Sequence, residues 1–488
     1  FFSMRYLYTL FFCILFKDTL AQKIVQVGTG EYYTAYLTDS GSVYIPISVG
    51  NRYFCKQLNS PEIFTDIACG LAQAIATNTQ GEAFIIGPGK TGRGIFAGIV
   101  AKDITGKNFT GVEKVYAIGN TFFALKKGKP FVWGEDILYV NGGKNIIAPF
   151  PVPVPANVTF TKLVPLSFDN SSVLALASNG TVWKYSRNVL KPAKINIPGL
   201  ARDITGIGSG VYVVETSIDL YAWGFLGSYL GVGDMGHRPV SIKSKWEAAG
   251  CRFPAKQISG NYGTLHILDA NNNLFGAGDN VHGDVGNGRQ WPDWSSYAPL
   301  PYSWSYAHGQ LIQKPVQITG KFNKICTAPN NVFYMYAQDM GGNWYSWGRN
   351  KARSLGNGIT LTPMDEARYP EALNIPAPEL VDPINTKWRQ IASFDPDERR
   401  FPIATAGINQ YISSSLTTLS AAFSSQQKGS INSFLWQNEN AQQAAVIESP
   451  ADEKTKVHNL QQGENSFKLT VINNYGDSAS TTVKVFVN

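Results

Sequence analysis

A recurring pattern of apolar and polar residues divides most of the chain into similar units. Each unit has a β-rich segment ending in glycine, a second apolar segment, a Gly/Asn turn and an aromatic-rich segment, often ending in Trp-Gly. Seven copies align on one apolar position: Val27, Ile67, Val115, Leu163, Ile204, Ile258 and Ile325. Their spacings are 40, 48, 48, 41, 54 and 67 residues. Units of this length, with three or four short strands each, predict the blades of a β-propeller.

The number of copies predicts a closed ring. A single blade cannot bury both of its faces, so seven blades are expected to pack side by side. An eighth start at Lys387–Ser393 has no matching continuation. We therefore predict that this segment pairs with the first blade, which would leave no long sheet edge exposed. The predicted propeller covers residues 23–395.

The chain before the repeats has the layout of a signal peptide. Residues 1–22 combine a basic start at Arg5, an uncharged apolar run from Leu7 to Phe16 and small residues around Ala21. The apolar run is too short to span a bilayer, and no other stretch is long and apolar enough. The sequence therefore predicts a secreted or cell-surface protein whose mature chain has no membrane span.

The pattern changes after the last repeat. Residues 396–401 are charged and bounded by prolines, as expected of a linker. Residues 402–488 contain six or seven short apolar segments separated by turn residues, including one that ends at Trp436. This spacing predicts a small β-sandwich with Trp436 in its core.

Composition agrees with an all-β protein. The 488 residues are 44% apolar, 12% aromatic and only 16% charged, and the 47 glycines are distributed along the chain. Distributed glycine favours tight turns between strands, and this composition argues against a helical bundle or coiled coil. The net charge of +7 is not concentrated in a Lys/Arg stripe, so we expect no binding to nucleic acid.

The last three repeats carry the most specific signature. They read LYAWGFLGSYLGVG from Leu220, LFGAGDNVHGDVGNG from Leu274 and WYSWGRNKARSLGNG from Trp344. These segments resemble the regulator-of-chromosome-condensation repeat, V-Y-x-W-G-x-N-x-x-G-x-L-G-x-G, although the first four copies lack the LGxG tail. The resemblance covers residues 23–395 and implies a seven-bladed propeller. The founding member acts on a small GTPase and chromatin, whereas secreted bacterial relatives are protein-binding scaffolds, so function does not follow from this fold.

The C-terminal segment resembles a second family. The residues that carry this resemblance are Ala406-Gly407, Asn409-Gln410, Ile431–Trp436, Ser449-Pro450 and Phe467–Val471. They are similar to the polycystic-kidney-disease (PKD) repeat, an immunoglobulin-like module common in secreted bacterial proteins. The resemblance covers residues 402–488 and implies an Ig-like β-sandwich.

Residues suited to catalysis are scarce. The chain has five histidines and none of the motifs HExxH, GxSxG or GxxxxGK[ST]. His282 and His308 lie close enough in sequence to meet near the sixth repeat, but isolated histidines are more often solvated loop residues than metal ligands. Asp279 and Asp284 flank a Gly-rich turn, where aspartate usually caps the turn. We therefore predict a non-enzymatic protein with no cofactor or metal.

One insertion exceeds the needs of a blade. Between Gly288 and Lys314 the sixth repeat carries an aromatic-rich segment among prolines and serines. Its aromatic residues are Trp291, Trp294, Tyr297, Tyr302, Trp304 and Tyr306. Exposed Trp and Tyr suit sugar rings or protein hot spots, so we predict a ligand platform. The alternative is a lid that packs over the propeller face.

Two minor features concern export. Cys55 and Cys69 are the nearest pair among the four cysteines after residue 22 and form the candidate disulfide, although buried thiols fit equally well. Four Asn-x-Ser/Thr sequons occur, at Asn108, Asn157, Asn170 and Asn179. A chain this rich in Asn, Ser and Thr contains several by chance.

Together these observations predict a secreted or cell-surface binding or adhesion protein, with the propeller as scaffold and the sandwich as spacer. The expected partner is an extracellular protein or a glycan, and self-association is compatible with the sequence. Two alternatives remain. One is a structural subunit of an extracellular layer or filament, which would show large flat contacts between copies. The other is the binding portion of a glycan-active enzyme, which would need two carboxylates or a His/Tyr pair converging in a cleft.

Overall fold

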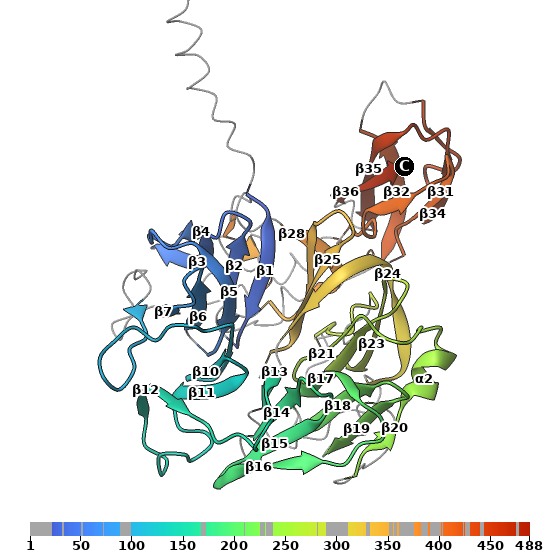
Figure 1. Ribbon diagram of the computed structural model, residues 1–488. Helices are drawn as coiled ribbons and strands as arrows, with labels where there is room; N and C mark the ends of the chain where they lie inside the picture. Colours follow the sequence, from blue (N-terminus) through green and yellow to red (C-terminus); the bar gives the residue numbers. More distant parts are fainter. Residues whose placement is uncertain are drawn as a thin grey trace, which may run out of the picture.

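The protein is described by a computed structural model, shown in Figure 1. The described residues are 22–31, 34–49, 52–71, 73–87, 99–166, 172–208, 210–224, 230, 238–280, 282–288, 311–327, 332–350, 355, 359–360, 375–381, 389–390, 402, 404–422, 424, 430–439, 444–474 and 478–488. The predicted signal peptide therefore lies almost entirely outside them, as does the predicted linker 396–401.

The first five blades are four-stranded antiparallel sheets whose strands follow one another in sequence. Their strands are β1 (Ile24–Thr29), β2 (Thr34–Thr38), β3 (Val43–Val49) and β4 (Arg52–Gln57); β5 (Phe64–Cys69), β6 (Ala74–Asn78), β7 (Ala83–Ile86) and β8 (Ile99–Val100); β9 (Lys114–Ile118), β10 (Thr121–Lys126), β11 (Lys129–Gly134) and β12 (Ile146–Pro151); β13 (Phe160–Leu166), β14 (Ser172–Ala177), β15 (Val182–Ser186) and β16 (Val189–Ile195); β17 (Ala201–Ile207), β18 (Val211–Thr216), β19 (Leu220–Gly224) and β20 (Val240–Ser241). The short helix α2 (Lys243–Ala248) follows the fifth blade.

The sixth and seventh blades share one long strand. The sixth contains β21 (Gln257–Gly260), β22 (Thr264–Leu268) and β23 (Asn273–Asp279), and the seventh contains β25 (Tyr334–Asp339), β26 (Trp344–Gly348) and β28 (Ile375–Val381). Strand β24 (Leu311–Cys326) pairs with β23 through its first part and with β25 from Phe322 onward. It therefore supplies the outer strand of one blade and the inner strand of the next.

The seven blades form a ring. The inner strands β1, β5, β9, β13, β17, β21 and β24 contact one another in turn, and β24 also contacts β1. In Figure 1 the sheets follow each other from blue β1–β4 to yellow β24 and β25. The predicted seven-bladed propeller is confirmed.

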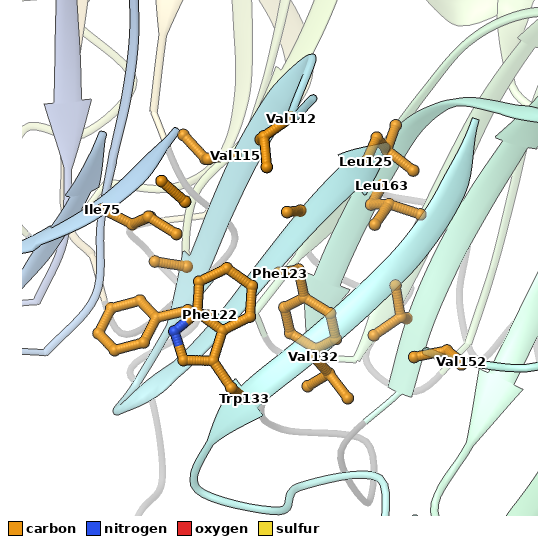
Figure 2. Close-up of a cluster of buried hydrophobic side chains, with 14 of the residues drawn as sticks. Ile75, Val112, Val115, Phe122, Phe123, Leu125, Val132, Trp133, Val152 and Leu163 are labelled. Atoms are coloured by element: carbon orange, nitrogen blue, oxygen red, sulfur yellow. The ribbon is translucent and has the colours of Figure 1, made fainter. Parts of the chain in front are cut away.

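Each blade is apolar on both sides because it packs between two neighbours. The second strand of a blade is buried along its length, as in β6 and β14. Figure 2 shows this packing for the third blade, where Phe123 and Trp133 lie among side chains that include Ile75 of the second blade and Leu163 of the fourth.

The predicted ring closure by Lys387–Ser393 lies mostly outside the described residues. Its described part is β29 (Arg389–Gln390), which pairs in parallel with β27 (Ile359–Thr360) and contacts β4 of the first blade. The first blade itself is a sheet of four strands from one continuous segment. Side chains also join the ends of the ring: the hydroxyls of Tyr36 and Tyr336 lie 2.9 Å apart, and Trp344 Nε1 donates to Ile24 O at 2.8 Å.

The C-terminal module is a β-sandwich, drawn in orange and red in Figure 1. One sheet has the order β30 (Gln410–Ile412), β36 (Ser478–Val487), β35 (Gly463–Asn473) and β32 (Ile431–Asn438); the other has the order β31 (Thr417–Ser420), β34 (Lys454–His458) and β33 (Val446–Ile447). Trp436 is buried in the core, and its Nε1 donates to Asp452 O at 3.1 Å. The predicted core position of Trp436 is confirmed.

Candidate binding face

The strand order gives the ring two different faces. Because neighbouring strands are antiparallel, the connections between strands 1 and 2 and between strands 3 and 4 of each blade emerge on one face. The turns between strands 2 and 3 and the links between blades emerge on the opposite face. We call the first the loop face and the second the link face.

Around the ring axis, polar side chains join the inner strands. They stand directly before the aligned apolar positions: Gln26, Asp66, Lys114, Lys162, Asp203, Gln257 and Lys324. Next to the ring axis each inner strand is paired on one side only, so the N–H and C=O groups of its other side need partners. Asp66 accepts from Val115 N at 2.9 Å, and Gln257 both accepts from Ile325 N at 3.0 Å and donates to Ile325 O at 2.7 Å. We call these seven residues the axial belt, and all of them except Lys114 form a side-chain hydrogen bond to a neighbouring blade, which connects the blades around the axis.

Glycines at the ends of the inner strands bring the blades together on the loop face. A Cβ atom added to Gly30 would overlap the carbonyl oxygen of Gly70, and one added to Gly70 would overlap that of Gly119. Gly260 stands in the same relation to Gly206. The glycine that ends the first segment of many repeats is therefore required by close approach of neighbouring backbones.

The asparagine of the repeat signature shapes the loops of the last two blades. Asn280 Oδ1 accepts from Val285 N at 3.0 Å, and Asn350 Oδ1 accepts from Leu355 N at 3.1 Å. Trp347 Nε1 donates to Asp284 O at 3.0 Å, which ties the loop of the sixth blade to the seventh. These contacts hold the loop face in a defined shape where the two blades meet.

An aromatic and cationic cluster lies on the loop face at this junction. The ring centroids of Tyr262 and Phe333 are 4.5 Å apart, and the His282 ring meets Phe333 edge-on at 5.1 Å. The Arg349 guanidinium lies 5.5 Å from the Phe333 ring centroid. Tyr262, Phe333 and Arg349 are half-buried, whereas His282 is buried. We call these four residues the Phe333 cluster.

Backbone hydrogen bonds position the cluster. Tyr262 N donates to Val332 O at 2.9 Å, and Arg349 N donates to Phe333 O at 2.7 Å. Tyr262 follows the inner strand of the sixth blade, Phe333 precedes β25, and Arg349 follows β26. Sequence reasoning missed these residues because each is a single aromatic or basic residue in a separate loop.

The aromatic residues predicted as a platform, Trp291, Trp294, Tyr297, Tyr302, Trp304 and Tyr306, lie outside the described residues. The ends of their segment are described. The segment leaves the sixth blade after Gly288, and Leu311 at its far end pairs with Asp279. Both ends therefore belong to the connection between strands 3 and 4 of the sixth blade, on the same face as the Phe333 cluster.

The other candidate groups have structural surroundings. Among the described residues no three His, Cys, Asp or Glu side chains are grouped to hold a metal ion; His308 lies outside this part. Asp279 and Asp284 are both buried in the loop of the sixth blade. No disulfide joins Cys55 to Cys69, and burial raises the pKa of the Cys69 thiol. In the described part of the chain, no helix has the length and apolar character needed to cross a membrane.

Comparison with known proteins agrees with both sequence resemblances. Residues 406–487 match a family model described as a PKD domain. The chain is similar to Prp20p of Saccharomyces cerevisiae, the yeast RCC1, with 15% identity over 66% of this chain and 77% of that one and a TM-score of 0.48. It is also similar to human WBSCR16, with 17% identity over 63% and 85% of the two chains and a TM-score of 0.48.

The C-terminal part has its own structural relative. The PKD domain of the KIAA 1837 protein is 28% identical and covers 17% of this chain and 84% of that one, with a TM-score of 0.17. The predicted regulator-of-chromosome-condensation-like and PKD-like resemblances are confirmed.

Proposed function

We propose that the protein is a secreted or cell-surface, non-enzymatic binding or adhesion protein that engages an extracellular protein or glycan through its loop face. The observation that carries this proposal is the Phe333 cluster at the junction of the sixth and seventh blades, beside both ends of the aromatic insertion. No other aromatic cluster of this kind, next to an insertion, occurs on the loop face of the described residues.

The chemistry of the cluster suits both expected ligand classes. Half-buried Tyr262 and Phe333 offer flat apolar surfaces to the C–H face of a sugar or to an apolar side chain. The Arg349 guanidinium against the Phe333 ring adds a positive charge beside that surface. Aromatic residues and arginine are the types that most often dominate binding energy at protein interfaces.

The position of the sandwich also favours the loop face as the binding face. The sandwich contacts the seventh blade at the turn between β25 and β26, where Asn343 Nδ2 lies 3.5 Å from Tyr411 Oη. This turn joins strands 2 and 3 and so belongs to the link face. The sandwich therefore holds the propeller from the link face and leaves the loop face directed away from it.

A binding screen with the purified mature chain tests the proposal. The chain is applied to glycan arrays, cell-wall preparations and extracellular protein arrays, and each ligand found is titrated against variants. We expect Phe333→Ala or Tyr262→Ala to weaken binding by roughly 5- to 150-fold, equivalent to about 1–3 kcal/mol. Tyr139→Ala is the matched control, because Tyr139 also lies in a loop-face connection and stacks with Arg187 at 4.2 Å, but in the third blade.

Three outcomes would contradict the proposal. Equal loss of binding in the Tyr139→Ala control would show that the Phe333 cluster is not the site. Self-association through large, flat contacts between copies, without any ligand, would favour the structural layer or filament instead. Turnover of a bound glycan would favour the glycan-active alternative.

A further inference from the structure

Three of the four sequons of this chain lie on the link face of the ring. Asn108 lies in the link between β8 and β9, Asn157 in the link between β12 and β13, and Asn179 in the turn between β14 and β15. Blade-to-blade links and the turns between strands 2 and 3 all belong to the link face. The fourth sequon, at Asn170, lies outside the described residues, in the connection between β13 and β14, which belongs to the loop face.

All three side chains are exposed and lie on adjacent blades. Asn108 Nδ2 donates to Glu82 Oε1 at 2.9 Å, which places this sequon beside the turn between β6 and β7. The hydroxyls of Thr159 and Ser178 lie 2.8 Å apart, which joins the Asn157 sequon to the turn that holds Asn179. The three sequons therefore lie along the second, third and fourth blades of the same face.

The same face carries exposed apolar side chains. Ile104, which is 85% exposed, stands in the same link as Asn108. Leu200, which is 61% exposed, lies beside Gly180 next to Asn179, and exposed Ile218 lies beside Gly199. Apolar side chains that gather on a surface favour association, and Leu200 and Ile218 lie near each other beside Gly199.

We propose that Asn108, Asn157 and Asn179 carry N-linked glycans, which cover the exposed apolar side chains of the link face. This inference rests on the export that forms part of the proposed function. In the transfer, the Nδ2–C1 bond to the sugar forms, and the C1–O bond to the pyrophosphate of a lipid-linked oligosaccharide donor breaks. The amide loses one proton, and the lipid pyrophosphate leaves. Glycans of this type are bulky and solubilising.

The acceptor sites are tested independently of the native leader. Residues 22–488 are expressed behind a heterologous leader in a eukaryotic secretory cell line, with Asn170→Gln in every variant. The protein from the medium is treated with peptide N-glycosidase in ¹⁸O-water and mapped by mass spectrometry. We expect labelled aspartate at positions 108, 157 and 179, and loss of one glycan in each single Asn→Gln variant. The conservative variants Thr110→Ser, Thr159→Ser and Thr181→Ser preserve the sequon and should keep the glycan.

An unmodified asparagine in this folded, exported protein overturns the proposal for that site. The covering role is tested by sedimentation velocity: the triple Asn→Gln variant should associate at lower concentration than the glycosylated protein, and an unchanged distribution overturns that role. A separate expression with the chain's own residues 1–22 tests export. Retention in the cell would contradict the secretion in the proposed function and leave the result on the acceptor sites intact.

Discussion

His266 is an unusual residue for the core of a propeller. It lies on β22 of the sixth blade with no exposed surface, and its ring meets Trp347 edge-on at 5.9 Å. Burial lowers the pKa of His266 to about 4, although backbone groups of Val285 and Asp284 partly oppose this effect. The imidazole is therefore neutral in the folded protein at neutral pH.

This burial predicts acid sensitivity. The unfolded chain takes up a proton at His266 as the pH falls below the ordinary value of 6.5, but the folded chain does so only near pH 4. The free energy of unfolding should therefore decrease between these values, by at most about 3 kcal/mol from this group. Urea unfolding across pH 4–8 measures the slope, and His266→Gln should flatten it. An identical slope in the variant would contradict the assignment.

As the pH falls, Glu215 should change the free energy of unfolding in the opposite direction to His266. It is 1% exposed on β18, where Oε1 accepts from Ala255 N at 2.6 Å, and burial raises the pKa of its carboxyl to about 7. A raised carboxyl pKa makes the ionised form costly, so protonation below about pH 7 should stabilise the fold. Glu215→Gln replaces the carboxyl group by an amide, whose oxygen can still accept from Ala255 N, and removes the charge. We expect it to raise the free energy of unfolding at pH 8 more than at pH 5, and an equal effect at both pH values would count against this.

At the scale of the strand, the glycine ends of the inner strands limit the side chains that each blade accepts. Gly260 has an ordinary backbone conformation, so only the approach of Gly206 O excludes a side chain there. We expect Gly260→Ala to force the blades apart and cost about 1–3 kcal/mol in thermal or urea unfolding. Gly106→Ala is the comparison, because nothing lies within 4 Å of its added Cβ and only its φ of +82° is unfavourable. A larger loss at Gly106 would show that backbone strain, not blade packing, dominates.

The sequence predicted the strands better than their connections. The aligned position Val27 marks an inner strand because local alternation and turn residues are sufficient to locate it. The role of Asp66 was not predictable, since its partner Val115 N is 49 residues away in another blade. The pairing of Lys387–Ser393 with β27 was not predictable, because an unmatched repeat start does not specify which strand lies beside it. Of the Phe333 cluster only His282 was singled out from the sequence, because its four residues meet only when the two blades are packed.

At the scale of the whole molecule, the sandwich is built into the seventh blade. Ile408 is 3% exposed and belongs to the same apolar cluster as Phe322 and Tyr345 of that blade. The hydroxyl of Tyr345 accepts from Asn409 N at 3.1 Å, and Asn409 Oδ1 accepts from Lys484 N of β36 at 2.9 Å. One short segment thus connects the propeller core to the sandwich, so the module is a fixed extension and not a loosely tethered spacer.

The last prediction follows from this shared core. Ile408→Ala leaves a cavity between the two modules and should cost about 2–4 kcal/mol, because a buried branched side chain loses both contacts and burial. If the modules unfold together, calorimetry of the full chain should show one transition that shifts to lower temperature as a whole. Val446→Ala, in the exposed part of the sandwich, is the matched control and should change the transition little. Two separate transitions, with only the sandwich transition shifted by Ile408→Ala, would contradict this prediction. The propeller would then fold independently of residues 406–412, and the contact of Ile408 with it would not contribute to its stability.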